Sequence, residues 1–139
     1  MASSTCIRLL LDMIVLHNWN TTQIDYVQAF PQAPAKKDLY LKAPAVFEVE
    51  GGKKGEYALK LHQNVYEQKQ ADRVWYKYLT KKLTEELVFE RSQVDECVFY
   101  RGKTIYVLYT DDSILAEPDQ EEIEQAIKDL NKSNLEVTD

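Results

Sequence analysis

The stretch that decides the fold of this chain is TIYVLYTDDSILA, residues 104–116. Two short apolar runs, residues 104–108 and 113–116, flank the acids Asp111 and Asp112, and this pattern predicts two strands joined by a tight turn. Adjacent carboxylates at a turn repel each other and lose solvation wherever the turn is covered, so a cation is expected to neutralise them. The turn therefore indicates a Mg²⁺ site.

A third carboxylate that would complete such a site lies far upstream, in the segment TQIDYVQAF at residues 22–30. Ile24 and Tyr26 flank Asp25 there and favour a strand, and Pro31 ends the run because it lacks a backbone donor. Asp25 is therefore expected at a strand end. Carboxylate-rich sites can hold two metal ions about 3.5–4 Å apart, which activate a hydroxyl and stabilise a leaving oxygen in phosphoryl transfer.

Three motifs follow one another along the chain: DYVQAF at residues 25–30, VYEQKQADRVW at residues 65–75 and YTDD at residues 109–112. In order and spacing they resemble the motifs of copia-type long-terminal-repeat retrotransposon reverse transcriptases. That family usually has Asp-Val-Lys-Thr-Ala-Phe, then Leu-Tyr-Gly-Leu-Lys-Gln-Ala-Pro-Arg-x-Trp, then Tyr-Val-Asp-Asp. Residues 39–44 also resemble its Val-Tyr-Met-x-Gln-Pro, so the resemblance covers nearly the whole chain.

The resemblance implies an RNA-directed DNA polymerase that uses an RNA or DNA template-primer, deoxynucleoside triphosphates and two Mg²⁺ ions, or Mn²⁺ in their place. It assigns Asp25 and Asp111 as the principal metal ligands and Asp112 as the weaker third. The bland alternative is a pair of turn acids with an unrelated strand-end acid, or a plain α+β domain whose acids bind a structural Ca²⁺.

The resemblance also assigns substrate-binding residues. Phe30 occupies the place of an aromatic that lies against the sugar 2′ position and excludes ribonucleotides, although an ordinary core Phe is equally consistent with the sequence. Lys69, Gln70 and Arg73 match the motif that lies near the incoming nucleotide and the template. The alternative for these three is a polar helix start.

Three positions depart from the family pattern. Glu67 replaces a Gly that a turn can require, and Asp72 replaces a Pro and places a charge where it could cap a helix or repel phosphate. Thr110 replaces an apolar residue, which is a mild change because Thr is also β-branched. These departures bear on turnover more than on the fold.

Composition is consistent with one domain of 139 residues, 45% of them hydrophobic. The net charge of −6 is concentrated at the end, because residues 111–139 hold ten acids and two bases whereas residues 1–110 hold thirteen acids and fifteen bases. A basic stretch, residues 36–82, could face a template-primer or simply be solvated helix surface. No secretory signal or membrane span is expected, so the chain is predicted to be intracellular, in a cytoplasmic particle or the nucleus.

Hydrophobic periodicity and turn residues predict a helix over 3–18 and a strand over 21–27. A looped region over 31–55 follows, with a strand pair near 38–42 and 56–61. The rest of the chain is predicted to form a helix over 70–87, strands over 97–100, 105–109 and after Asp112, and a last helix through 132. Trp75, Leu79 and Leu83 should form the buried stripe of the second long helix. This order predicts an α+β fold, a palm-like antiparallel sheet with helices packed on one face.

The resemblance further implies that residues 1–139 are the palm and part of the fingers of a longer Pol polyprotein, with thumb and ribonuclease H domains absent. An isolated chain of this kind is expected to show little or no processive synthesis. The main alternative is a non-catalytic nucleic-acid-binding remnant of the same fold.

Overall fold

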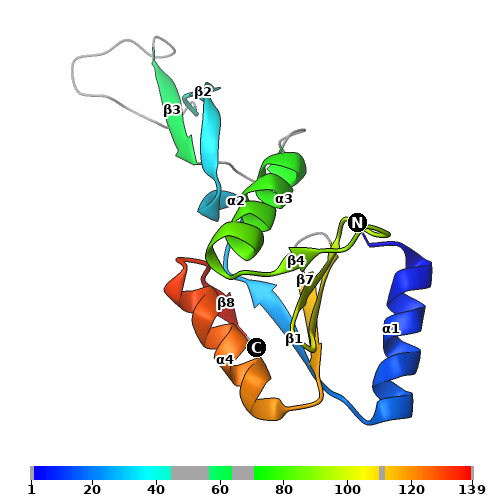
Figure 1. Cartoon of the computed structure of the whole chain (residues 1–139). Helices are drawn as coiled ribbons and strands as arrows, with labels where there is room; N and C mark the ends of the chain where they lie inside the picture. Colours follow the sequence, from blue (N-terminus) through cyan, green and yellow to red (C-terminus); the bar gives the residue numbers. More distant parts are fainter. Residues whose placement is uncertain (1, 45–56, 64–70, 110–111, 139) are drawn as a thin grey trace.

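The centre of the molecule is an antiparallel sheet built around the paired strands of residues 104–109 and 112–117 (Figure 1). The structure, a computed structural model, describes residues 2–44, 57–63, 71–109 and 112–138, except for the side chains of residues 35–37. Within these residues, six strands pair in the order β4-β5-β6-β7-β1-β8. Their bounds are β1 Asn20–Tyr26, β4 Glu90–Arg91, β5 Val98–Arg101, β6 Thr104–Tyr109, β7 Asp112–Glu117 and β8 Val137–Thr138.

The side chains of the central strands alternate between two faces, as the pleat requires. On one face Ile24, Leu108 and Ser113 lie opposite one another in a fully buried row. The other face carries the residues between them, and its row at the end of β6, β7 and β1 is exposed. The hairpin predicted from the sequence is therefore confirmed for its two strands.

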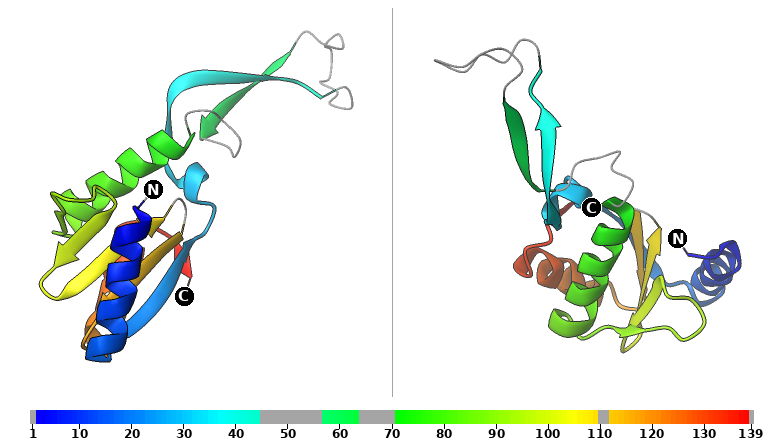
Figure 2. Two further views of the ribbon diagram at one scale, coloured as in Figure 1. Left: turned by 90° about the vertical axis from the view of Figure 1, so that its right-hand side faces the viewer. Right: turned by 90° about the horizontal axis from the view of Figure 1, so that it is seen from above.

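Two long helices cover the buried face that includes Ile24 (Figure 2). Helix α3 spans Ala71–Lys81 and continues as a π-helix, η1, over Lys82–Glu86. Trp75, Leu79 and Leu83 are at most 1% exposed, which confirms the predicted stripe. Helix α4 spans Gln120–Lys132 and is capped by Asp119, whose carboxylate accepts the Glu121 N–H at 2.9 Å.

Helix α1, Ser4–His17, lies against the opposite face of the sheet (Figure 2). Leu10 is buried there, and Ile7 and Arg8 line a hollow together with Tyr109 of β6. The expectation that all helices pack on one face is therefore wrong for α1. Its apolar stripe was recognisable, but a helix stripe shows only that a helix is covered on one side, not which side of a sheet covers it.

A separate two-stranded sheet projects from the body as an arm (Figure 1). Its strands are β2, Pro34–Lys42, and β3, Ala58–Gln63, close to the predicted pair. A short helix α2, Ala29–Gln32, precedes the arm; it was not predicted, and its second half falls in the region 31–55 that was expected to be loop. The strands β4 and β8 were also missed, because two-residue strands leave no period in the sequence.

Candidate active site

The predicted catalytic acids lie at one end of the central sheet. Asp25 on β1 is directly opposite Asp112 on β7, and Asp112 is also opposite Tyr109 on β6. Directly opposite residues of antiparallel strands project from the same face, so the two carboxylates share one face. Both side chains are exposed. Asp111, the third predicted ligand, lies outside the described residues, as does Thr110.

The end of β1 that carries Asp25 is held by contacts far apart in sequence. Thr138 of β8 pairs with Asp25, and the Val27 N–H donates to the Glu136 carbonyl at 3.0 Å. The Gln32 side-chain amide donates to the Val27 and Glu136 carbonyls at 2.5 and 3.0 Å, and its oxygen accepts the Glu136 N–H at 3.1 Å. Gln32 thus ties α2 to both strands beside Asp25.

A chain of hydroxyl groups lies beneath the carboxylates, on the buried face of the same strands. The Tyr106 hydroxyl is 2.5 Å from the Tyr26 hydroxyl and 2.5 Å from the Ser113 hydroxyl. Tyr26 is 3% exposed, and Tyr106 and Ser113 are fully buried. Burial raises the pKa of both tyrosines well above the ordinary value, and the neighbouring Tyr106 adds to the rise of the Tyr26 pKa.

Two carboxylates on neighbouring strands can share a cation, because carboxylate oxygens are the ligands that Mg²⁺ prefers. Without one, like charges placed directly opposite each other destabilise the strand pair. Among the described residues, no group of three His, Cys, Asp or Glu side chains gathers to hold a metal. Asp25 and Asp112 therefore fit a cation site as two of its ligands, and the metal assignment stays a prediction.

The predicted substrate residues are only partly described. Phe30 is 7% exposed and belongs to the core cluster, which fits the alternative of an ordinary core Phe, and its contact with a nucleotide sugar stays a prediction. Arg73 is exposed on α3, and Asp72 is exposed in the first turn of that helix. Lys69, Gln70 and Glu67 lie outside the described residues.

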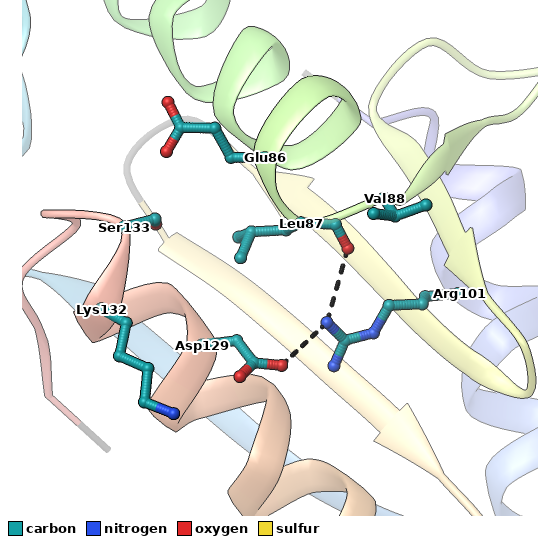
Figure 3. Close-up of a pocket in the computed structure, with 7 residues that line it drawn as sticks. All are labelled: Glu86, Leu87, Val88, Arg101, Asp129, Lys132 and Ser133. Atoms are coloured by element: carbon teal, nitrogen blue, oxygen red, sulfur yellow. Dashed lines mark hydrogen bonds and ion pairs between the residues drawn. The ribbon is translucent and has the colours of Figure 1, made fainter.

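A pocket of about 500 Å³ lies away from the carboxylates, between η1 and α4 (Figure 3). Arg101 reaches into it from β5 and pairs with Asp129 at 3.0 Å, while the same guanidinium group donates to the Leu87 carbonyl at 3.4 Å. The remaining lining residues are Glu86, Val88, Lys132 and Ser133. Its acids and bases balance in number, and Arg101 was not among the candidate residues predicted from the sequence.

Sequence reasoning did not single out the hydroxyl chain. Ser113 and Tyr106 stand in strands that were expected to be apolar, and Tyr26 was considered only as a strand former. The sequence did contain a clue to this chain of hydroxyls, because Tyr26 follows Asp25 and Ser113 follows Asp112. Side chains alternate along a strand, so both hydroxyls must lie on the face of the sheet opposite to the carboxylates. That Tyr106 lies between the Tyr26 and Ser113 hydroxyls follows only from the register in which β6 pairs with β7.

Comparison with known sequences defines the class of this protein. The family described as "Reverse transcriptase (RNA-dependent DNA polymerase)" matches the chain over residues 1–139. The chain therefore belongs to the reverse transcriptase family. Together with the transposon relatives described next, this match confirms the recognition of a retrotransposon reverse transcriptase from the three motifs.

The curated proteins that are similar to this chain include Pol polyproteins of transposons. The chain is 28% identical over 134 residues to the "Retrovirus-related Pol polyprotein from transposon TNT 1-94" of Nicotiana tabacum, covering 93% of this chain and 10% of that protein. It is 28% identical over 122 residues to the "Transposon Ty1-NL2 Gag-Pol polyprotein" of Saccharomyces cerevisiae, covering 88% of this chain and 7% of that protein. The chain thus spans about a tenth or less of the length of these relatives.

No solved structure matches the chain significantly. The described helices and sheet are compatible with the α+β class, and the palm assignment rests on the sequence motifs. None of the helices in the described residues is both long enough and apolar enough to cross a membrane.

Proposed function

We propose that this chain is the catalytic palm segment of a copia-type retrotransposon reverse transcriptase, which adds deoxynucleotides to a primer on an RNA or DNA template. One observation carries the proposal. Asp25 of the first motif lies directly opposite Asp112 of the third motif, although they are 87 positions apart in sequence. The family match over the whole chain supports the same function.

The proposed reaction joins the primer 3′ oxygen to the α-phosphorus of a deoxynucleoside triphosphate. The bond from that phosphorus to the bridging oxygen breaks, pyrophosphate leaves, and the primer hydroxyl proton is released. Mg²⁺ supplies charge neutralisation and a more acidic primer hydroxyl when it is bound. Asp25 and Asp111 would hold the ions as the principal ligands, with Asp112 as the weaker third.

The surroundings of the carboxylates fit this role. Both acids are exposed on the end row of the sheet, so a primer terminus can approach them, while the row behind them is buried. Each acid lies on a strand that is paired on both sides, β1 with β7 and β8, and β7 with β6 and β1. Such pairing limits motion of the ligands. This matters because good alignment of the reacting groups can lower the activation barrier by about 7–11 kcal/mol.

Primer extension on an RNA template tests the proposal. The 139-residue chain is compared with a version extended by the flanking regions of one of the longer Pol relatives. Each is assayed with Mg²⁺ and with the substitution Asp25→Asn, Asp111→Asn or Asp112→Asn. We expect synthesis by the extended version that is lost in the variants, and little processive synthesis by the short chain, because flanking domains would help to hold the primer terminus.

Two outcomes would contradict the proposal. Synthesis that survives the Asp25 and Asp111 substitutions would refute the site assignment. Absence of synthesis from both folded versions would favour a second function, binding of template-primer without catalysis. The observation that favours this alternative is Asp72, an exposed acid in the first turn of α3 where the family has Pro. Binding of a labelled template-primer in a mobility-shift assay would then separate a binding remnant from an unrelated domain.

A further inference from the structure

The hydroxyl chain connects the three strands that meet at the candidate site. Tyr26 is the residue after Asp25 on β1, and Ser113 is the residue after Asp112 on β7. Tyr106 of β6 reaches both hydroxyls, each at 2.5 Å. The carboxylates therefore lie on the opposite face of β1 and β7 from the Tyr26 and Ser113 hydroxyls, one residue away along each strand.

Packing alone does not require hydroxyl groups at these positions. The Tyr106 ring makes edge contacts with Phe89 and Phe99, each at a centroid distance of 6.0 Å, and the Tyr26 ring makes one with Trp75 at 5.0 Å. A Phe would fill either ring position equally well. Since a buried hydroxyl costs free energy unless it is hydrogen-bonded, three mutually bonded hydroxyls in this core point to a role for the bonds themselves.

The carboxylates need such a restraint on their strands. Asp25 and Asp112 face each other across β1 and β7, where two like charges push the strands apart whenever they are not neutralised. On its other side, within the described residues, β1 pairs with the two-residue strand β8, and Val27 and Gln32 add hydrogen bonds to Glu136. The hydroxyl chain crosses from β1 to β7 through Tyr106 directly beneath this point.

We propose that Tyr106 is a positioning residue, whose hydroxyl bonds to Tyr26 and Ser113 hold the strand ends so that Asp25 and Asp112 stay at a separation that binds a divalent cation. This inference rests on the proposed function and deepens it. Tyr106 does not touch the cation or the substrate. It acts through the backbone of the residues that follow the two ligands.

The test measures Mn²⁺ binding to the complete 139-residue chain by the electron paramagnetic resonance signal of free Mn²⁺. Tyr106→Phe removes the central hydroxyl and keeps the ring. The matched control is Tyr76→Phe, which removes a hydroxyl that donates to the Glu96 carbonyl at 2.9 Å, outside the hydroxyl chain. Asp25→Asn defines the part of the signal that belongs to the site. Thermal unfolding of each variant is recorded beside it.

We expect Tyr106→Phe to weaken Mn²⁺ binding about 10-fold, the low end of the 10–100-fold loss that follows removal of groups bonded directly to metal ligands, because Tyr106 acts on the ligands only through their neighbours. Tyr76→Phe should bind as the unmodified chain does. Unchanged binding in Tyr106→Phe, or an equal loss in Tyr76→Phe, would overturn the positioning role while leaving the cation site intact. If the unmodified chain does not bind Mn²⁺, or Asp25→Asn binds equally well, the cation site itself fails and the positioning role with it.

A second variant keeps the inference testable if Tyr106→Phe does not fold. Ser113→Ala removes one end of the chain and leaves the bond between Tyr26 and Tyr106. It should weaken Mn²⁺ binding less than Tyr106→Phe would, but more than the Tyr76→Phe control does. Binding equal to that of the control would overturn the inference.

Discussion

The central sheet and the β2–β3 arm are both antiparallel, yet they are stabilised in different ways. Strands β6 and β7 bury most of their side chains, whereas no described side chain of β2 or β3 is buried. Tyr40 and Leu41 of the arm are 59% and 48% exposed. A two-stranded sheet alone is marginally stable, so the arm depends on its backbone ladder and local contacts while the body depends on burial.

The largest effect should come from the core helix. Trp75 is 1% exposed, and its ring packs on Tyr26, so Trp75→Ala should lower the free energy of unfolding by about 3–5 kcal/mol. The matched change in the arm, Tyr40→Ala, should alter it by less than about 0.5 kcal/mol. Chemical denaturation of both variants measures the difference. Similar values would show that the arm, not only the body, is held by burial.

Alkaline pH should destabilise the body through its buried tyrosines. Burial raises the folded-state pKa of Tyr26 and Tyr106 above the unfolded value of about 10. Their stabilising contribution is therefore complete below pH about 10 and is lost as the pH rises above it, by about 1.4 kcal/mol per pH unit for each tyrosine.

Phenolate absorbance and unfolding, followed together, check this prediction. Of the nine tyrosines in the chain, Tyr26 and Tyr106 should ionise only when the chain unfolds. In Tyr26→Phe and Tyr106→Phe the loss of stability per pH unit should be smaller. Ionisation of all tyrosines before unfolding would contradict the buried hydroxyl chain.

Two ion pairs sharpen the comparison between body and arm. The Arg101 and Asp129 side chains are 23% and 25% exposed, and Arg101 also lies over the Phe89 ring at 4.8 Å. The Lys60 and Asp38 side chains in the arm are 45% and 67% exposed, although their charged atoms are 2.8 Å apart. Arg101→Met should cost about 1–2 kcal/mol, and Lys60→Met less than about 0.5 kcal/mol.

Double-mutant cycles with Asp129→Asn and Asp38→Asn measure the two pair energies. The arm pair should weaken further as salt is added, because exposed charges are screened more than partly buried ones. A pair energy in the arm that equals that of the body would mean that the short distance, rather than burial, sets its value.

The smallest predicted effect is a gain in stability. Val88 follows η1 with φ of +57°, a conformation that strains a β-branched residue, and Phe89 then donates back to the Leu83 carbonyl at 2.8 Å. The Val88 side chain is 73% exposed, so little packing is lost when it is removed. Val88→Gly should relieve about 1–2 kcal/mol of strain and lose about 0.5–1 kcal/mol to chain entropy, a net gain of roughly 1 kcal/mol or less.

The control for this change is Val94→Gly, at a site that is 90% exposed and not among the described residues with positive φ. It should destabilise the chain, because only the entropic loss remains. Thermal unfolding midpoints compare the two variants. Destabilisation by Val88→Gly would show that the side chain contributes contacts that its exposure does not reveal.

Sequence reasoning was most successful where a pattern is local. The strands on both sides of the acid turn and the helix stripe of Trp75, Leu79 and Leu83 each depend on residues near one another in the chain. Their periods follow from helix and strand geometry alone. The metal assignment of Asp25, Asp111 and Asp112 could be stated from the motifs, but the described residues place only two of these acids together.

The amino-acid sequence by itself determined the family, the strand and helix segments and the identity of the candidate acids. Only the tertiary structure decided that α1 lies on the opposite face of the sheet from α3, that Asp25 lies opposite Asp112, and that Tyr106 joins Tyr26 to Ser113. The physical reason is that periodicity specifies which side of a segment is buried. The partner that buries it is set by strand register and by packing between residues as many as 113 positions apart.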